Sequence, residues 1–170
     1  MVYKFRVEMT YDKKLNYIRH LNDLDKIWKI KIFNDGEETV RGLQIKLSFV
    51  PDFAESWIGH IDEIKAGERA DINEPNLVIN PEKLLSYNEK LEGNIIVELM
   101  PADGQSEAVY KEAFPLTVLP YDQWLSNDHP ELLATFVTPN DRRVLEILAK
   151  AGKRLGVQEG IAFSGYGSKQ

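Results

Sequence analysis

Alternation of apolar and polar residues constrains this chain more than any other feature of its sequence. Near the start, every second residue is apolar or aromatic, and these residues are Tyr3, Phe5, Val7, Met9 and Tyr11. The residues between them are charged or carry a hydroxyl group. Side chains on a β-strand point to opposite faces in turn, so this period of two predicts a strand with one buried face. Such a strand needs a second apolar layer to cover it.

The same pattern recurs over the next hundred residues. Trp28, Ile30 and Ile32 alternate with lysines, which places Trp28 in the expected core, and the turn sequence Asn34-Asp35-Gly36 follows. Further strand candidates cover residues 43–49, 58–64, 70–72, 77–79, 93–100 and 108–118. Seven or eight short strands without long intervening helices favour an antiparallel β-sandwich over a doubly wound parallel sheet.

Helical signals are confined to two places. Asn80 is a good N-cap before Pro81, so we expect one short crossing helix over residues 81–89. After Pro120 the apolar period becomes helical, and Gly156 is placed to end the last helix. We therefore expect a β-sandwich domain over residues 1–119, a helical junction over 120–156, and a loop or truncated linker over 157–170 that leads to a missing downstream domain.

Composition narrows the compartment and the partners. The chain has no cysteine, 43% hydrophobic residues and a formal net charge of −6. No aliphatic run approaches the roughly 20 residues needed to cross a bilayer, and the N-terminus lacks the apolar segment of a secretory signal. A cytoplasmic location without membrane contact is expected. The net negative charge lies on the expected sandwich, which should repel a phosphate backbone. Nucleic acid could therefore bind only to a basic face outside the sandwich.

One stretch suggests a family. Leu119-Pro120-Tyr121-Asp122-Gln123-Trp124, followed by Pro130-Glu131-Leu132-Leu133-Ala134-Thr135-Phe136-Val137-Thr138-Pro139-Asn140, resembles a junction in large bacterial proteins related to superfamily I DNA helicases. In those proteins an immunoglobulin-like sandwich precedes the junction. The resemblance implies an immunoglobulin-like antiparallel β-sandwich followed by a C-terminal helical segment.

The resemblance also implies a role. No phosphate-binding G-x-x-x-x-G-K-[ST] loop occurs in these residues, so this piece is not the motor of a helicase. It implies a noncatalytic interaction or scaffolding domain at the N-terminus of a larger helicase-like protein. The expected partners are downstream domains of the same polypeptide or another protein chain.

The junction supplies most of the candidate interaction residues. Trp124, Phe136 and Val137 are expected to couple the sandwich to the helices. The polar side of the last helix is basic and carries Arg142, Arg143, Lys150, Lys153 and Arg154. It is the only surface through which nucleic acid contact is possible, but a solvated or protein-facing surface is the favoured interpretation.

Two other classes of function stay open. Trp57, with Asp52 or Glu55 nearby, could form a platform for a carbohydrate or another small ligand, because an indole offers a flat apolar face and an N–H donor. An enzyme could instead use scattered carboxylates with His60 or His129. The spacing of these residues matches no catalytic, cofactor-binding or metal motif, so the sequence assigns no residue to those roles.

Overall fold

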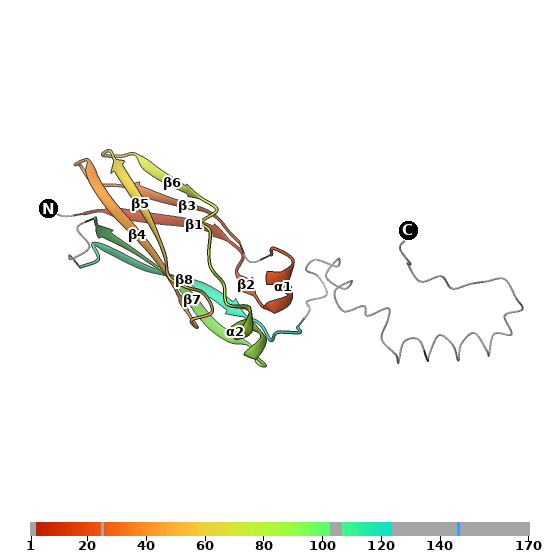
Figure 1. Cartoon of the computed structure of the whole chain (residues 1–170). Coiled ribbons are helices and arrows are strands. Elements are labelled where there is room, and N and C mark those ends of the chain that lie inside the picture. Colours follow the sequence, from red (N-terminus) through yellow and green to blue (C-terminus); the bar gives the residue numbers. More distant parts are fainter. Residues whose placement is uncertain (1–2, 25, 103–106, 124–145, 147–170) are drawn as a thin grey trace, which may run out of the picture. The chain divides into compact units, whose positions relative to one another are not determined.

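Two β-sheets make up the fold (Figure 1). The structure, a computed structural model, describes residues 3–24, 26–102, 107–123 and 146. One sheet has the order β1-β3-β6 and comprises β1 (Phe5–Tyr11), β3 (Ile27–Asn34) and β6 (Arg69–Asn73). The other has the order β2-β8-β7-β4-β5 and comprises β2 (Lys14–Leu15), β4 (Val40–Val50), β5 (Trp57–Ile64), β7 (Leu91–Pro101) and β8 (Tyr110–Val118). A mainly β fold is thereby confirmed. Among the strands that the structure describes, β2 pairs with β8 in parallel and the other pairs are antiparallel.

Two short helices accompany the sheets within the described residues. The expected helix is α2 (Pro81–Ser86), and the Asn80 side chain caps it by accepting from the backbone N–H groups of Glu82 and Lys83. The other, α1 (Tyr17–Leu21), was not expected. None of the described helices is long and apolar enough to cross a membrane. Most of the expected helical junction and all of residues 157–170 lie outside the described residues, so the expected domain limits stay predictions.

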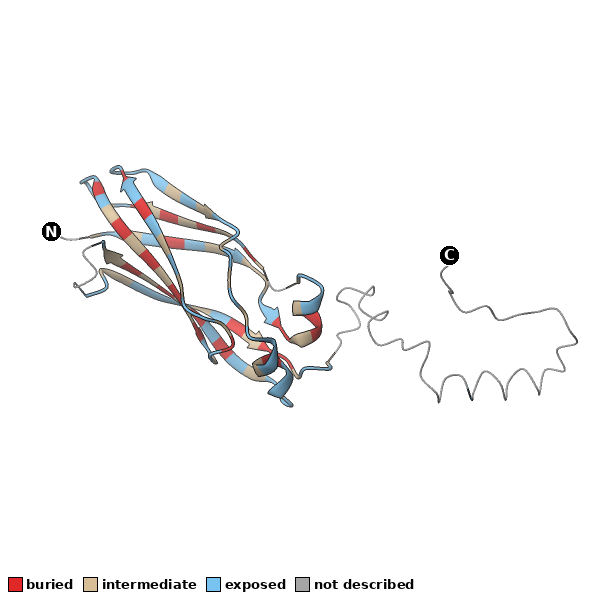
Figure 2. Ribbon diagram, viewed as in Figure 1, coloured by how far each residue is buried: buried red, intermediate tan, exposed pale blue. Residues whose placement is uncertain are grey.

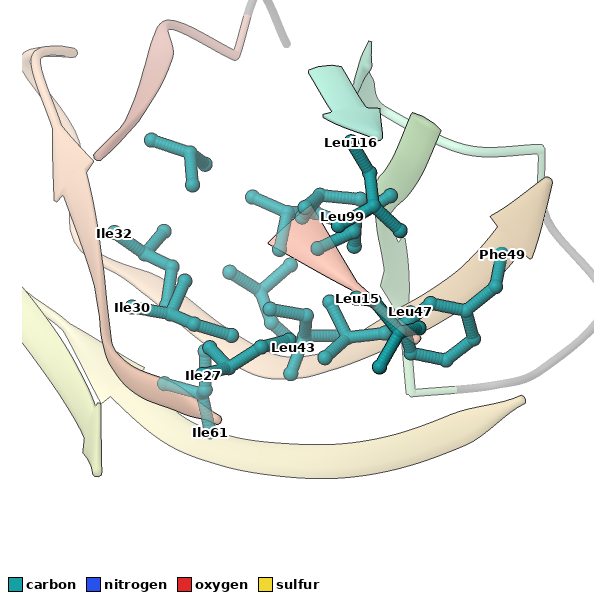
Figure 3. Close-up of a cluster of buried hydrophobic side chains, with 14 of the residues drawn as sticks. Leu15, Ile27, Ile30, Ile32, Leu43, Leu47, Phe49, Ile61, Leu99 and Leu116 are labelled. Atoms are coloured by element: carbon teal, nitrogen blue, oxygen red, sulfur yellow. The ribbon is translucent and has the colours of Figure 1, made fainter. Parts of the chain in front are cut away.

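Apolar side chains from both sheets meet between the layers. Figure 3 shows Ile30 and Ile32 of β3 lying across from Leu43 and Leu47 of β4, and Figure 2 shows buried positions alternating with exposed ones along the strands. Ile30, Ile32 and Leu47 are all fully buried. Burial of each such side chain contributes about 1.5–3 kcal/mol to folding, so this layer is the main stabilising element.

The prediction that Trp28 belongs to the core is wrong. Lys29 of β3 pairs with Thr10 of β1, but the next pair joins Ile27 to Tyr11, so Trp28 is an extra residue in a bulge. The extra residue shifts the alternation by one position, and Ile27 takes the buried place. The Trp28 side chain is 43% exposed, with the Lys26 ammonium 5.7 Å from its ring centroid.

The strand expected over residues 77–79 is also absent. That segment makes a single bridge, between Ile79 and Ala54. β6 ends just before Glu74, which has a positive φ of 42°, and Pro75 follows without a backbone donor. The segment is instead held by hydrogen bonds from Glu55 N to Val78 O and from Asn80 N to Phe53 O.

The beginning and end of the sandwich are tied together at β2. Leu119 N donates to Leu15 O over 2.8 Å beside the β2–β8 pair. Asn16, fully buried, accepts from Arg19 N at the start of α1 and donates through Nδ2 to Pro120 O and Gln123 O, at 2.9 and 2.8 Å. One side chain therefore caps a helix and anchors the segment after β8.

Two tyrosines close the side of the sandwich between β1 and β8. The Tyr11 hydroxyl donates to Pro115 O at 2.6 Å, and its ring makes an edge contact with Phe114. The Tyr110 hydroxyl hydrogen-bonds to Glu112 and to the Val7 backbone of β1. These side chains bridge two strands that belong to different sheets.

Tyr110 predicts a loss of stability at high pH. Burial, and then the hydrogen bond to Glu112, raise the pKa of Tyr110 from 10.0 to about 12. The folded chain therefore holds this proton more tightly than the unfolded chain does, so its contribution is complete below pH 10 and is lost as the pH rises towards about 12. In urea titrations, Y110F should show a shallower decline of unfolding free energy over that interval. The exposed Tyr121 provides the control, Y121F, and an equally steep decline in Y110F would contradict the prediction.

Candidate functional site

The buried polar side chains of the described region make structural contacts. Its buried polar residues are Asn16, Arg19 and Asn34. Asn34 donates to Glu38 O and Ile64 O and accepts from Gly36 N. Within the described residues, every buried side-chain nitrogen and oxygen has a hydrogen-bond partner. These groups are used in holding turns together.

The histidines and carboxylates do not assemble into a metal site in the described part of the chain, where no three such side chains are grouped. His60 is exposed on β5. His20 lies in α1 and lines a separate cleft, and His129 lies outside the described residues. The structure therefore does not bring His60 to the carboxylates that line the clefts. The enzyme alternative gains no constellation from the described residues.

One cleft of about 340 Å³ is lined by polar side chains near Ile27, the first residue of β3. His20, Asp23, Lys26 and Glu74 lie at its rim, over an apolar floor that includes Ile27. Asp23 and Glu74 both have positive φ, 56° and 42°. Asp23 N donates to His20 O in a turn after α1, whereas Glu74 N donates to Trp28 O beside the pairing of β6 with β3. The cleft between these two segments is open to solvent.

Trp57, the proposed ligand platform, is half-buried and packs against the core. Its indole lies across Gly59, where an added Cβ would overlap the ring, and beside Ile45. This placement turns the ring inward on the sheet. Gly59 therefore covers part of the indole, and the role of Trp57 as a ligand platform stays a prediction.

Asp52 and Glu55 lie in another place. Together with Lys83 they line an open cleft of about 420 Å³ that does not include Trp57. Asp52 forms an ion pair with Lys83, and this hydrogen bond and charge hold the pKa of the Asp52 carboxyl below its ordinary value. The three residues of the ligand-platform hypothesis are thus not brought together.

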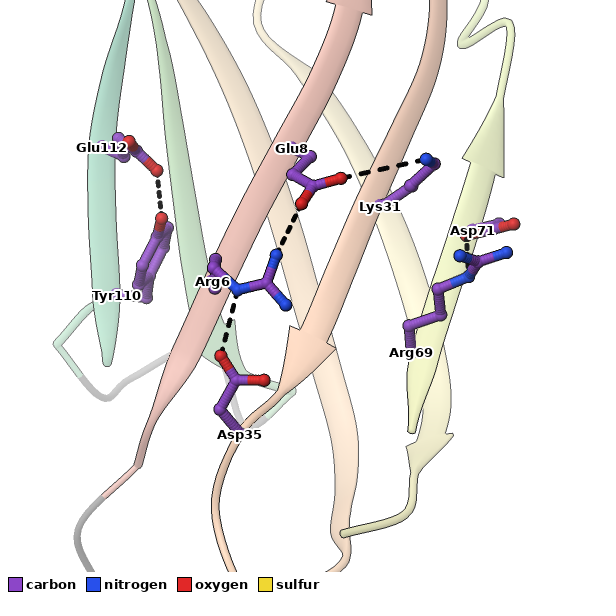
Figure 4. A network of polar contacts seen from close by, with 8 residues as sticks. All are labelled: Arg6, Glu8, Lys31, Asp35, Arg69, Asp71, Tyr110 and Glu112. Atoms are coloured by element: carbon purple, nitrogen blue, oxygen red, sulfur yellow. Dashed lines mark hydrogen bonds and ion pairs between the residues drawn. The ribbon is translucent and has the colours of Figure 1, made fainter. Parts of the chain in front are cut away.

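The outer face of the three-stranded sheet is covered by ion pairs (Figure 4). Arg6 contacts Glu8 and Asp35, and Asp71 contacts Lys29 at 2.6 Å and Arg69 at 3.2 Å. Exposed pairs of this kind contribute roughly 0–1 kcal/mol each. Since opposite charges already neutralise one another there, this face has little excess charge with which to attract a partner.

Three of the four sheet edges have their backbone groups covered or interrupted, namely β1, β6, and β8 with its two-residue partner β2. On β1, the Val7 backbone bonds to Tyr110. On β8, Pro115 has no N–H, its carbonyl accepts from Tyr11, and β2 pairs with the last two residues. β6 is five residues long and carries charged Arg69 and Asp71. Short length, charges, proline and covering side chains are the usual protections of a sheet edge.

β5 has fewer of these protections. It is eight residues long, contains no proline or lysine, and carries its acidic residues, Asp62 and Glu63, near one end. Ile58, at the other end, is 50% exposed. The pairing with β4 occupies only one side of the strand, because β5 is the last strand of its sheet.

The backbone groups that β5 leaves open follow from the register. Ala102 N donates to Gly42 O, so even-numbered residues of β4 direct their backbone groups to β7 and odd-numbered ones to β5. Residues 57, 59 and 61 of β5 pair with those odd-numbered residues. Ile58 and His60 therefore direct their N–H and C=O groups to the open side, and Asp62 is the next residue in this alternation, at the point where the pairing with β4 is interrupted. The Asn34 side chain already takes the next outward group, Ile64 O.

The remaining candidate residues cannot be placed. Trp124, Phe136 and Val137, and the basic set Arg142, Arg143, Lys150, Lys153 and Arg154, lie outside the described residues. Their expected roles in the junction and in nucleic acid contact stay predictions. The open edge of β5 was not identified from the sequence, because the alternation of residues 58–64 predicts a strand but not its place in the sheet.

Comparison with known proteins gives a distant likeness to solved structures and no family. No family model matches the chain, and no curated protein matches it. A chain of the CsuC–CsuE chaperone–tip adhesion subunit pre-assembly complex from the archaic chaperone-usher Csu pili of Acinetobacter baumannii is 14% identical, with 83% of this chain and 68% of that chain covered at a TM-score of 0.32. The prediction of a helicase-related family, and of a scaffolding role in a helicase-like protein, is therefore wrong: the similar structure is a pilus-assembly complex, and no helicase-related family matches.

Proposed function

We propose that this chain is a noncatalytic protein-binding module that takes up an extended segment of another protein along β5. The observation that carries the proposal is the pair of outward backbone positions on β5, Ile58 and His60, which nothing in the described part of the chain covers. The noncatalytic part rests on the buried polar groups, which are all used structurally among the described residues. A cytoplasmic location stays part of the proposal, since a chain without cysteine needs no oxidising compartment.

Strand addition suits this edge physically. An antiparallel segment would exchange two hydrogen bonds with each outward residue of β5, and each such bond contributes about 0.5–1.5 kcal/mol net. Affinity would come from the backbone, and selectivity from side chains that alternate between the two faces of the sheet. The half-exposed Ile58 would lose its contact with water at the same time.

Proline at His60 is the decisive substitution. His60 directs its N–H outward, so H60P removes a donor from the open edge and leaves the donors to β4 in place. H60A provides the matched control because it removes the side chain and keeps the N–H. From a displayed library of random peptides selected on the full chain, we expect binders that H60A retains and that H60P weakens at least tenfold.

The measurement is the dissociation constant of each selected peptide for the three proteins, with circular dichroism to confirm that H60P is folded. Binders that tolerate H60P would place the binding surface elsewhere. A selection without binders would also overturn the proposal. Sedimentation showing a dimer that H60P dissociates would replace the partner by a second copy of the chain.

A further inference from the structure

Asp62 is the one charged side chain on the outward row of β5, and the sheet leaves it without a neighbour. The pairing of β5 with β4 is interrupted beside Asp62, where Gly42 of β4 has no side chain and a positive φ of 61°. Glu63, by contrast, pairs with Arg41 at 2.6 Å. No ion pair engages Asp62 among the described residues, so its carboxylate faces the open edge without a compensating cation.

The other end of the row has the opposite character. Ile58 is 50% exposed, and its neighbour across the strand pair is Lys46, whose stem lies on the same face. His60 lies between Ile58 and Asp62, opposite Gln44. The outward row thus runs from an apolar residue, through a neutral one, to an unpaired negative charge.

We infer that the segment bound along β5 is antiparallel to it and carries a lysine or arginine opposite Asp62 and an aliphatic residue opposite Ile58. This inference rests on the proposed function and names the chemistry of its partner. Antiparallel pairing sets residues directly opposite one another, so the basic residue comes first in the segment and the aliphatic residue follows four positions later. The two residues flanking the middle position face the inner side, near Gly59 and Ile61, and are apolar.

Charge complementarity favours a segment with a basic residue over a second copy of the chain as the partner. Antiparallel pairing of β5 with itself about His60 would place Asp62 beside Ile58 of the copy, which leaves both carboxylates without a cation. Each chain also has a formal net charge of −6, which opposes self-association. A basic segment meets neither objection.

The test uses a synthetic peptide, Thr-Lys-Val-Thr-Val-Ile-Thr with blocked ends and a fluorescent label, whose lysine would lie opposite Asp62. Its control carries glutamate in place of that lysine. Cross-strand pairs contribute about 0.2–1 kcal/mol, so we expect the change from a favourable to a repulsive pair to weaken binding about five- to tenfold. D62K should reverse the preference, while E37K, with the same change of charge on the exposed turn before β4, should not.

The outcomes separate this inference from the proposed function. If both peptides bind equally well and H60P abolishes both, the edge binds a segment but the assigned chemistry is wrong. If neither peptide binds at millimolar concentration while library binders sensitive to H60P exist, the inference also fails alone. If library binders are absent as well, the proposed function fails with it. Stronger binding of the reversed sequence, Thr-Ile-Val-Thr-Val-Lys-Thr, would overturn the antiparallel orientation.

Discussion

Alanine at Gly93 is expected to destabilise the sandwich by about 3 kcal/mol or more, at the upper end of overpacking effects in well-packed cores. Gly93 lies on the buried face of β7, where the chain at the end of β4 approaches most closely. An added Cβ would overlap the Val50 carbonyl oxygen and come within 3.0 Å of Pro51 Cδ. Since the obstacle is mainly backbone, no side-chain rotation can relieve it.

Urea unfolding followed by tryptophan fluorescence measures this effect on the full chain. Gly67 supplies the matched control, because it has a positive φ of 72° but nothing within 4 Å of an added Cβ. G67A should therefore cost only the backbone penalty of a left-handed alanine, about 1–2 kcal/mol. A G93A chain as stable as G67A would show that β4 and β7 are not so closely apposed.

Aspartate at Asn16 is expected to cost about 3 kcal/mol at neutral pH, because it buries a charge against two carbonyl groups. Asp keeps the oxygen that caps α1 but loses the two donors to Pro120 O and Gln123 O. Burial should hold the pKa of the introduced carboxyl above its ordinary value. The destabilisation should then shrink at acid pH, where the protonated form regains one donor.

Asn80 offers the control for that substitution. It caps α2 with the same side-chain oxygen, but it is exposed and its amide nitrogen is not needed. N80D should change the unfolding free energy by no more than about 0.5 kcal/mol. Equal effects of N16D and N80D would mean that the buried amide donors contribute little, and that the segment after β8 is held by its backbone bonds alone.

Much of the secondary structure could be predicted because it is local. The alternation that ends before Pro51 gives β4, and Asn80 with Pro81 marks the start of α2. Trp28 was misplaced because a bulge depends on how two strands pair, and one extra residue reverses the faces that a strict period assigns. Leu77–Ile79 has the composition of a strand but forms only one β-bridge, between Ile79 and Ala54.

The candidate site could not be predicted for a related reason. An edge is a property of strand order, and the sequence of β5 contains the strand without its neighbours. The protections of the other edges are equally nonlocal: Tyr11 covers Pro115 from 104 positions away. The half-buried position of Trp57 could not be predicted either, because it depends on Gly59, two residues further along the same face. One signal was available, in the absence of proline and lysine from residues 57–64.

The contact between β2 and β8 has a consequence for how this domain comes into being. The Asn16 amide can form its hydrogen bond to Pro120 O only after residue 120, which is 104 residues later, has been synthesised. Chains dominated by such distant pairings fold slowly, on the order of milliseconds to seconds. During synthesis at about 5–20 residues per second, the early strands would therefore spend several seconds without their final partners. β5 is synthesised midway through that interval. The proposed partner segment would therefore first be able to bind β5 on the nascent chain.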